Sequence, residues 1–287
     1  MYHIGGRPFP CNEARPEEGK RLTTIRAVLF DLGETLWHFP TMPPVELIRG
    51  ETVRRINALL LSWGIEPDGE LFFLGRDIRF ALEEADREAY YGDCVSPHCP
   101  TLAKQVAAEK GLHLTDEQAE HLWLTWNLGG TFFGRALHEG ALDTLNWLRE
   151  RGYPLAAVTN RYVGGEPFRD EMRQLGVLDY FDVLSISCDV GYMKPHPQIF
   201  QHALDALAVS PQETVMVGDS LRADVGGAQA LGILTVWRRN HASREGHSSA
   251  QDEFDERPRG ATAEPVHAQP DYVVETLWEV TQLPIFR

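Results

Sequence analysis

The sequence predicts an α/β protein with a doubly wound parallel sheet, into which an all-helical domain is inserted after the first strand. Two apolar runs that lie far apart in the chain, Ala27–Phe30 and Val215–Val217, stop beside an acidic residue, Asp31 and Asp219 respectively. Short apolar runs bounded by Gly and polar residues are typical of buried parallel strands. After Gly134, helical and strand-like segments alternate, which is the pattern of crossover units on a parallel sheet.

The composition is that of a globular protein and argues against nucleic-acid or membrane partners. The chain has 287 residues, 43% of them hydrophobic, which is enough to fill the core of one or two domains. A net charge of −15 opposes contact with a phosphate backbone. No apolar run approaches the roughly 20 residues of a membrane helix, and the first residues lack the apolar stretch of a secretion signal. We expect a cytoplasmic monomer or homodimer.

The four cysteines, Cys11, Cys94, Cys99 and Cys188, are too few and too scattered for a disulfide framework, and we expect reduced thiols. Cys94, His98 and Cys99 lie close enough in sequence to suggest a metal site. Their C-x3-H-C spacing is not a standard zinc pattern, and no fourth ligand is evident. The favoured interpretation is a Pro-rich loop between two helices.

The inserted segment is helical from Pro44 to about Asn127. Apolar residues recur at near-helical spacing, with Pro suited to a first helical position and Gly to a helix end. The fourth helix begins at Thr115, whose hydroxyl forms a capping-box pattern with Gln118. The expected helices are Pro44–Gly64, Glu70–Tyr91, Thr101–Lys110 and one starting at Thr115.

The remainder of the chain resumes the sheet. The expected helices are Gly140–Arg151, Pro167–Leu175, Pro197–Leu207 and Arg222–Leu231, and the expected strands are Pro154–Val158, Asp182–Ser187, Thr214–Val217 and Ile233–Trp237. Tyr272–Val274 follows as a short edge strand, before a terminal helix. We predict an α/β core of residues 22–42 and 135–287 and a helical domain of residues 43–134. Residues 1–21 and 240–269 are expected to be flexible extensions.

Polar residues follow four of the predicted strands at what would be one edge of the sheet. They are Asp31, Thr159-Asn160, Lys194 and Asp219. Any one of them could merely cap a helix or make a turn. Open parallel sheets, however, place their chemistry in the crevice beyond the carboxyl ends of the strands. Converging carboxylates repel unless a cation lies between them, and their oxygens suit Mg²⁺. The set therefore predicts phosphoryl transfer with an acidic nucleophile.

With these residues the chain resembles the haloacid dehalogenase-like hydrolase superfamily, whose four motifs match in order across about Ile25 to Leu283. The matching segments are Asp31–Thr35, Thr159-Asn160, Lys194-Pro195 and Gly218-Asp219 with Asp224. The resemblance implies a Rossmann-like core and a helical cap that closes over the substrate. It also implies a Mg²⁺-dependent phosphatase that acts on a small phosphorylated metabolite.

The resemblance assigns roles to the matching residues. Asp31 would attack phosphorus and become an aspartyl phosphate, which water later hydrolyses. Thr159 and Asn160 would hold phosphate oxygens, and Lys194 would compensate charge between Asp31 and the transferring group. The implied magnesium ligands are Asp31, the main-chain carbonyl of Gly33, Asp219 and Asp224, the last as a direct or indirect ligand.

One departure from the family pattern concerns the leaving group. Phosphatases of this family usually carry a second Asp two residues after the nucleophile, where this chain has Gly33. That Asp is the general acid, and losing such a group costs about 10²–10⁴ in rate. Glu34 and His38 are neighbours that could relay a proton, but an exposed turn carboxylate and an imidazole packed beside Trp37 are the favoured interpretations.

Two alternatives therefore stay open beside the phosphatase. A catalytically weak or silent module that binds phospho-ligands would explain Gly33. A carbon–halogen hydrolase would use Asp31 on carbon, but it has little need for Asp219 and Asp224. The sequence does not name a substrate. Arg76 and Arg79 could meet an acidic one, although solvated arginines are the favoured interpretation on so charged a helix.

Overall fold

A six-stranded parallel sheet forms the centre of the molecule in the computed structural model, which describes residues 24–239 and 268–286. The sequence predictions for residues 1–21, for Cys11 and for most of 240–269 fall outside these residues. The strands are β1 Ala27–Phe30, β4 Leu155–Thr159, β5 Val183–Ile186, β6 Thr214–Gly218, β7 Leu234–Arg238 and β8 Tyr272–Val274. Their order is β5-β4-β1-β6-β7-β8, and every neighbouring pair is parallel.

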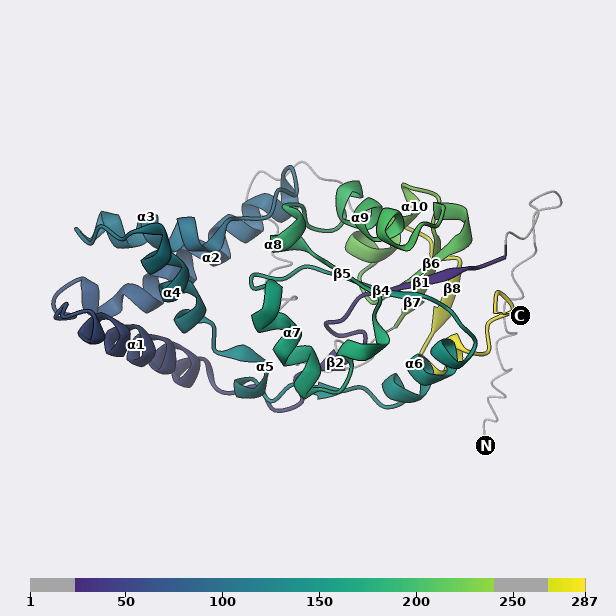
Figure 1. Cartoon of the computed structure of the whole chain (residues 1–287), viewed down its shortest axis with the longest axis horizontal. Helices are drawn as coiled ribbons and strands as arrows, with labels where there is room; N and C mark the ends of the chain where they lie inside the picture. Colours follow the sequence, from purple (N-terminus) through teal and green to yellow (C-terminus); the bar gives the residue numbers. More distant parts are fainter. Residues whose placement is uncertain (1–23, 240–267, 287) are drawn as a thin grey trace, which may run out of the picture.

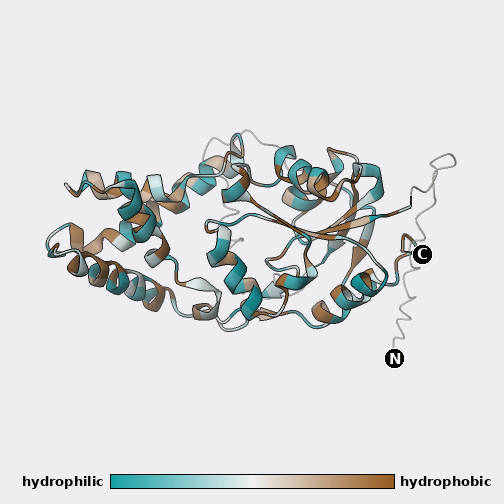
Figure 2. Cartoon of the chain, in the orientation of Figure 1, coloured by the Kyte–Doolittle hydropathy of each residue, from teal (hydrophilic) through white to brown (hydrophobic). Residues whose placement is uncertain are grey.

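Helices cover both faces of this sheet, as the doubly wound prediction requires. Along β1, Val28 and Phe30 point into the core on one face and Leu29 into the core on the other. The first face packs against α6 (Ala141–Glu150), α7 (Gly165–Gln174) and α11 (Leu277–Val280). The second packs against α9 (Pro197–Leu207) and α10 (Gly227–Gln229). Figure 2 shows the resulting hydrophobic strands between helices of mixed character. Burial on both faces explains why the strands are continuously apolar.

The first four helices after β1 gather at one end of the molecule, away from the sheet (Figure 1). They are α1 Val45–Ser62, α2 Leu74–Tyr91, α3 Cys99–Glu109 and α4 Asp116–Trp126, and they share a hydrophobic cluster that Val163, after β4, joins. The predicted capping box is present, because the Thr115 hydroxyl accepts a hydrogen bond from the Gln118 amide at 3.1 Å. Helix α3 starts earlier than expected because His98 caps it and Pro100 occupies its first turn.

Several short elements were not predicted. Strand β2 (Trp37–His38) pairs antiparallel with β3 (Ala136–Leu137). This pairing joins the segment that precedes the four helices α1 to α4 to the segment that follows them. Two further short helices are α5 (Gly129–Phe132) and α8 (Ser187–Val190). The helix expected from Arg222 to Leu231 is instead a π-helical segment, Leu221–Gly226, followed by α10. Within the described residues, no helix combines the length and the apolarity needed to cross a membrane.

Candidate active site

The candidate site lies where the strand order of the sheet reverses. From β1 the chain continues to β4 and β5 on one side, whereas from β6 it continues to β7 and β8 on the other. Asp31 directly follows β1 and Asp219 directly follows β6, and these two strands are neighbours. The Asp31 amide donates to the Val217 carbonyl at 2.9 Å, which extends the ladder and fixes the position of Asp31. A doubly wound sheet binds its ligands at such a reversal, beyond the carboxyl ends of the strands.

A buried lysine joins two of the carboxylates at this edge. Lys194 Nζ lies 2.5 Å from Asp31 Oδ1 and 2.7 Å from Asp224 Oδ1. The relative exposure is 7% for Asp31, 2% for Lys194 and 1% for Asp224. Burial opposes the ammonium charge, but the carboxylates of Asp224 and Asp31 outweigh it and raise the pKa of Lys194 above its usual value. Lys194 is therefore a fixed positive charge beside Asp31.

Three carboxylates share this space with that single cation. Oxygens of Asp31, Asp219 and Asp224 all lie within 4.8 Å of one another. Burial and repulsion from the other two carboxylates raise the pKa of Asp219 well above its usual value. Burial likewise raises the pKa of Asp224, although Lys194 partly offsets it. The excess of negative charge and the oxygen donors fit a hard divalent cation such as Mg²⁺. Across residues 24–239 and 268–286, no second group of His, Cys, Asp and Glu gathers in this way.

The loop after β6 holds Asp224 in place by a close backbone approach. The Ser220 amide donates to Asp224 Oδ2 at 2.9 Å. A Cβ at Gly218 would lie 2.3 Å from Asp224 Cγ, so only Gly fits there. Asp219 is supported from the other side of the site, because the buried Thr35 hydroxyl donates to Asp219 Oδ1 at 3.1 Å. The first and last sequence motifs therefore meet directly.

Asn160 positions Lys194 in the structure. Its Oδ1 accepts from the Lys194 amide at 2.7 Å, and its Nδ2 donates to the Lys194 carbonyl at 3.1 Å. The sequence predicted only a phosphate contact for Asn160. One Nδ2 hydrogen is left for that contact, because an amide nitrogen carries two. Thr159 is the last residue of β4 and is buried at the same sheet edge.

Gly33 lies in open surroundings. A Cβ added there would meet no atom within 4 Å, and its φ is outside the left-handed region. The next residue, Glu34, does adopt a positive φ of 53°. His38 stacks on His138 with ring centroids 4.2 Å apart, and burial followed by repulsion from Arg238 lowers its pKa. The structure thus makes His38 a packed, neutral imidazole, as the favoured interpretation expects.

The Cys94, His98 and Cys99 side chains have separate local partners. The thiols of Cys94 and Cys99 donate to the carbonyls of Tyr90 and Pro97 respectively. His98 Nδ1 accepts from the Thr101 amide at 3.3 Å and so caps α3. These contacts are those of the loop interpretation, and the three side chains do not gather as metal ligands.

The two candidate arginines of α2 differ from each other. Arg76 forms an ion pair with Asp77 at 2.7 Å and stays partly exposed. Arg79 is not the solvated residue that the sequence favoured. Its guanidinium lies over the Trp126 ring at 4.6 Å, and burial lowers its pKa. Arg79 is therefore part of the packing of the helical segment.

The helical segment also contacts the core close to Lys194, which sequence reasoning missed. The Ser96 amide donates to the Gly191 carbonyl at 3.0 Å, and the Met193 amide donates to the Cys94 carbonyl at 2.9 Å. Val95 and Tyr192 form an antiparallel bridge between these two bonds. The residues just before Lys194 are thus attached to the segment between α2 and α3. Backbone pairing of this kind leaves no sequence signal.

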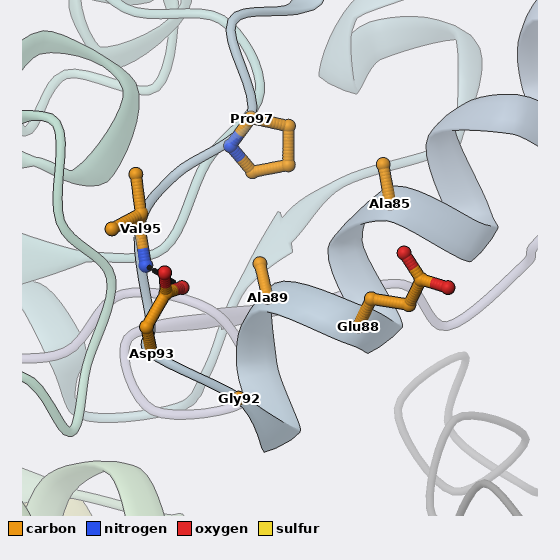
Figure 3. A pocket seen from close by; sticks show the side chains of 7 residues that line it. All are labelled: Ala85, Glu88, Ala89, Gly92, Asp93, Val95 and Pro97. Atoms are coloured by element: carbon orange, nitrogen blue, oxygen red, sulfur yellow. Dashed lines mark hydrogen bonds between the residues drawn. The ribbon is translucent and has the colours of Figure 1, made fainter.

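A hollow of about 430 Å³ lies on the surface beside this contact, where α2 ends (Figure 3). Its walls are mostly small side chains, and Asp93 turns inward to accept a hydrogen bond from the Val95 amide at 3.0 Å. The lining residues are Ala85, Glu88, Ala89, Gly92, Asp93, Val95 and Pro97. None of the predicted site residues lines it, so the hollow is distinct from the charged cluster at the sheet edge.

Comparison with known proteins gives a consistent picture. A family model described as haloacid dehalogenase-like hydrolase matches residues 25–232, and a second model, described as HAD-hydrolase-like, matches residues 191–280. Glyceraldehyde 3-phosphate phosphatase from Methanopyrus kandleri is 30% identical over 212 residues, which are 74% of this chain and 83% of that protein. Ribulose-1,5-bisphosphate 5-phosphatase from Halopiger xanaduensis is 29% identical over 262 residues, which are 90% of this chain and 98% of that protein.

Solved structures show the same architecture. A HAD phosphatase from Thermococcus onnurineus matches with a TM-score of 0.50 and 26% identity, covering 90% of this chain and 97% of that one. A 2-haloacid dehalogenase from Pseudomonas syringae matches with a TM-score of 0.55 and 21% identity over the same shares. At 21% identity, the match to the dehalogenase shows a shared fold alone.

Proposed function

This chain belongs to the haloacid dehalogenase-like hydrolase family, and from that membership we propose that it is a Mg²⁺-dependent phosphatase of a small phosphorylated metabolite. One observation carries the proposal. Asp31, Lys194 and the nearby pair of Asp219 and Asp224 come from separate parts of the chain and meet in one largely buried cluster beyond the carboxyl ends of β1 and β6. Two relatives named as phosphatases, of which this chain covers 83% and 98%, support the same reaction class.

In this proposal the acidic cluster holds the metal ion. The oxygens of Asp31, Asp219 and Asp224 and the main-chain carbonyl of Gly33 would be the protein ligands. Bound there, Mg²⁺ would supply positive charge that stabilises the transferring phosphoryl group. Residues 43–134 would form a helical cap beside the site.

Asp31 is the proposed nucleophile. Its free carboxylate oxygen would form a bond to phosphorus while the ester P–O bond breaks and the leaving oxygen takes up a proton. Water would then hydrolyse the aspartyl phosphate and regenerate Asp31. The ammonium of Lys194, 2.5 Å from Asp31 Oδ1, would offset charge on the phosphoryl oxygens. Thr159 and the remaining N–H of Asn160 would hold those oxygens.

Gly33 sustains one competing proposal. Because no side chain is present where the family usually places its general acid, the chain could bind phospho-ligands and turn them over weakly or not at all. Dehalogenation through Asp31 is the less favoured alternative, since the clustered carboxylates would have little purpose there.

Phosphate release decides between these proposals. We expect Mg²⁺-dependent release from p-nitrophenyl phosphate and from some members of a panel of sugar and short-acid phosphates. Asp31→Asn should abolish it, whereas Asp179→Asn, on the turn after α7, should not. Turnover that survives Asp31→Asn would refute the nucleophile. Magnesium binding without any phosphate release would support the silent module, and halide release from a 2-haloacid would support the dehalogenase.

A further inference from the structure

Two arginines and one glutamate form a buried cluster between the helical segment and the sheet edge. Arg135 follows α5 and Arg161 follows β4, while Glu171 lies on α7. Arg135 Nη1 lies 2.7 Å from Glu171 Oε2, and Arg161 Nη2 lies 3.5 Å from the same oxygen. Helices α5 and α7 lie side by side here (Figure 1). One carboxylate thus faces two guanidinium groups.

The cluster is enclosed by rings and by a close backbone approach. The Arg135 guanidinium lies 4.7 Å from the Trp37 ring centroid, and that of Arg161 lies 4.9 Å from the Phe168 centroid. A Cβ at Gly130 would lie 2.2 Å from Arg135 Cζ, so any larger residue would displace the guanidinium. The Arg135 side chain is 3% exposed, whereas that of Arg161 is 23% exposed. Part of the Arg161 side chain is therefore open to solvent, whereas that of Arg135 is enclosed.

The two arginines of this cluster carry two positive charges, and Glu171 supplies only one negative charge. Burying a cation without a matching anion is costly. Within the described residues, Nε of Arg135 and Nε of Arg161 are buried and have no hydrogen-bond partner. Burial, reinforced by repulsion from Arg135 and only partly offset by Glu171, lowers the pKa of Arg161 to about 10. The geometry leaves one positive charge and buried N–H groups without a partner.

Along the chain, the cluster is directly connected to the proposed catalytic residues. Arg161 follows Asn160, whose side chain holds the Lys194 backbone. Its own backbone is fixed, because Ser187 Oγ accepts from its amide at 2.9 Å and donates to its carbonyl at 3.1 Å. Trp37, beneath Arg135, lies at the end of the loop that begins at Asp31. Both arginines are thus anchored at the edge where β1 and β4 end.

We propose that Arg161, held in place with Arg135, binds a second anionic group of the substrate, a carboxylate or a second phosphoryl group, while Asp31 acts on the phosphate ester. The proposal rests on the phosphatase function. A guanidinium presents a planar fork of donors that matches either kind of oxyanion. Arg161 is the contacting residue, and Arg135 is a positioning residue.

The test compares three phosphate esters of similar size in the presence of Mg²⁺. 2-Phosphoglycolate carries one carboxylate as its second anion, ethylene glycol bisphosphate carries a second phosphoryl group, and 2-hydroxyethyl phosphate carries no second anion. The wild-type chain should have a kcat/KM at least tenfold higher for one or both two-anion esters. The ester that is favoured identifies the second anion. Arg161→Gln should lower the ratio of two-anion to one-anion kcat/KM by about ten- to a hundredfold, mainly through KM.

Matched variants separate binding from a structural role. Arg149→Gln removes the same charge from the exposed face of α6 and should leave the ratio unchanged. Arg161→Lys keeps the charge but loses the planar fork, so its ratio should fall between those of the wild type and Arg161→Gln.

Two results would overturn the inference. One is a wild-type ratio near one, which needs no variant to fold. The other is an equal loss on all three esters in Arg161→Gln. If no ester is hydrolysed by the wild type, the proposed function fails instead, and calorimetric titration with the same three compounds then decides the inference from the binding ratio.

Discussion

Asp219→Asn should stabilise the metal-free protein and at the same time remove its stabilisation by magnesium. Asp219 faces two carboxylates, Asp31 and Asp224, and one ammonium, that of Lys194. Two like charges 4.8 Å apart repel by about 3.5 kcal/mol at an effective dielectric constant of about 20. The Lys194 ammonium offsets one of the two repulsions on Asp219, so the net repulsion is roughly that of one carboxylate. Partial protonation of Asp219 relieves part of it.

We therefore expect Asp219→Asn to raise the free energy of unfolding by about 1–3 kcal/mol in EDTA. The neutral amide can still accept the hydrogen bond that the Thr35 hydroxyl donates at 3.1 Å. In the wild type, Mg²⁺ at a hundred times its dissociation constant should add about 2.7 kcal/mol, because it binds the folded state alone. The variant should gain far less. The stability advantage of the variant over the wild type should thus shrink or reverse when EDTA is replaced by Mg²⁺.

Urea unfolding followed by tryptophan fluorescence, in EDTA and in Mg²⁺, measures both quantities. Asp179→Asn, on the turn after α7, is the matched control and should respond to magnesium as the wild type does. A variant less stable than the wild type in EDTA would refute the argument that the cluster carries excess negative charge. Equal stabilisation of both proteins by magnesium would show that Asp219 is not a ligand.

Three further predictions concern residues around the cluster. The surroundings of Gly33 leave room for the side chain of Gly33→Asp. This variant should increase kcat for alkyl phosphates by at most about 10²–10⁴-fold, and by more than it increases kcat for p-nitrophenyl phosphate. Equal effects on the two substrates would show that the missing general acid does not limit the rate. Burial, opposed by the Tyr162 hydrogen bond, raises the pKa of Asp86 to about 6, so its folded form holds a proton more tightly than the unfolded chain and stability falls as pH rises from about 4 through 6. Asp86→Asn should therefore be up to about 3 kcal/mol more stable than the wild type in urea melts at pH 7.5 and gain little at pH 4, and a gain that does not depend on pH would contradict this. Asn160→Ala removes both hydrogen bonds to the Lys194 backbone and should lower kcat by about five- to a hundredfold, and an unchanged kcat would show that Lys194 needs no such support.

The sheet and its acidic edge could be predicted because burial on both faces leaves a strong local pattern. Each central strand is a short apolar run, and the run that forms β1 was predicted with its observed bounds, Ala27–Phe30. Parallel strands share one carboxyl edge, so the convergence of Asp31 and Asp219 followed from topology alone. The helix boundaries were accurate where a cap marked them, as at Thr115.

The remaining features depend on contacts that no local pattern encodes. Trp37 and Leu137, paired across β2 and β3, are about a hundred residues apart in sequence. The π-helical turn that carries Asp224 has the composition of an ordinary helix start. Arg79 looks like a solvated cation in the sequence, and only tertiary packing places the Trp126 ring against it. Side-chain surroundings, unlike strand positions, are properties of the assembled fold.

The backbone pairing of residues 94–96 with 191–193 bears on how a substrate enters. If α1 to α4 swing outward as a unit, the two hydrogen bonds must separate first, at about 0.5–1.5 kcal/mol each. Breaking both bonds would cost about 1–3 kcal/mol, so the open form would still be populated at roughly 1–15%. Opening on the microsecond-to-millisecond timescale would then admit ligand. Because the same bonds end one residue before Lys194, each opening would leave Asn160 as the remaining backbone support of Lys194. Entry of a substrate would then briefly loosen the residue whose ammonium lies beside Asp31.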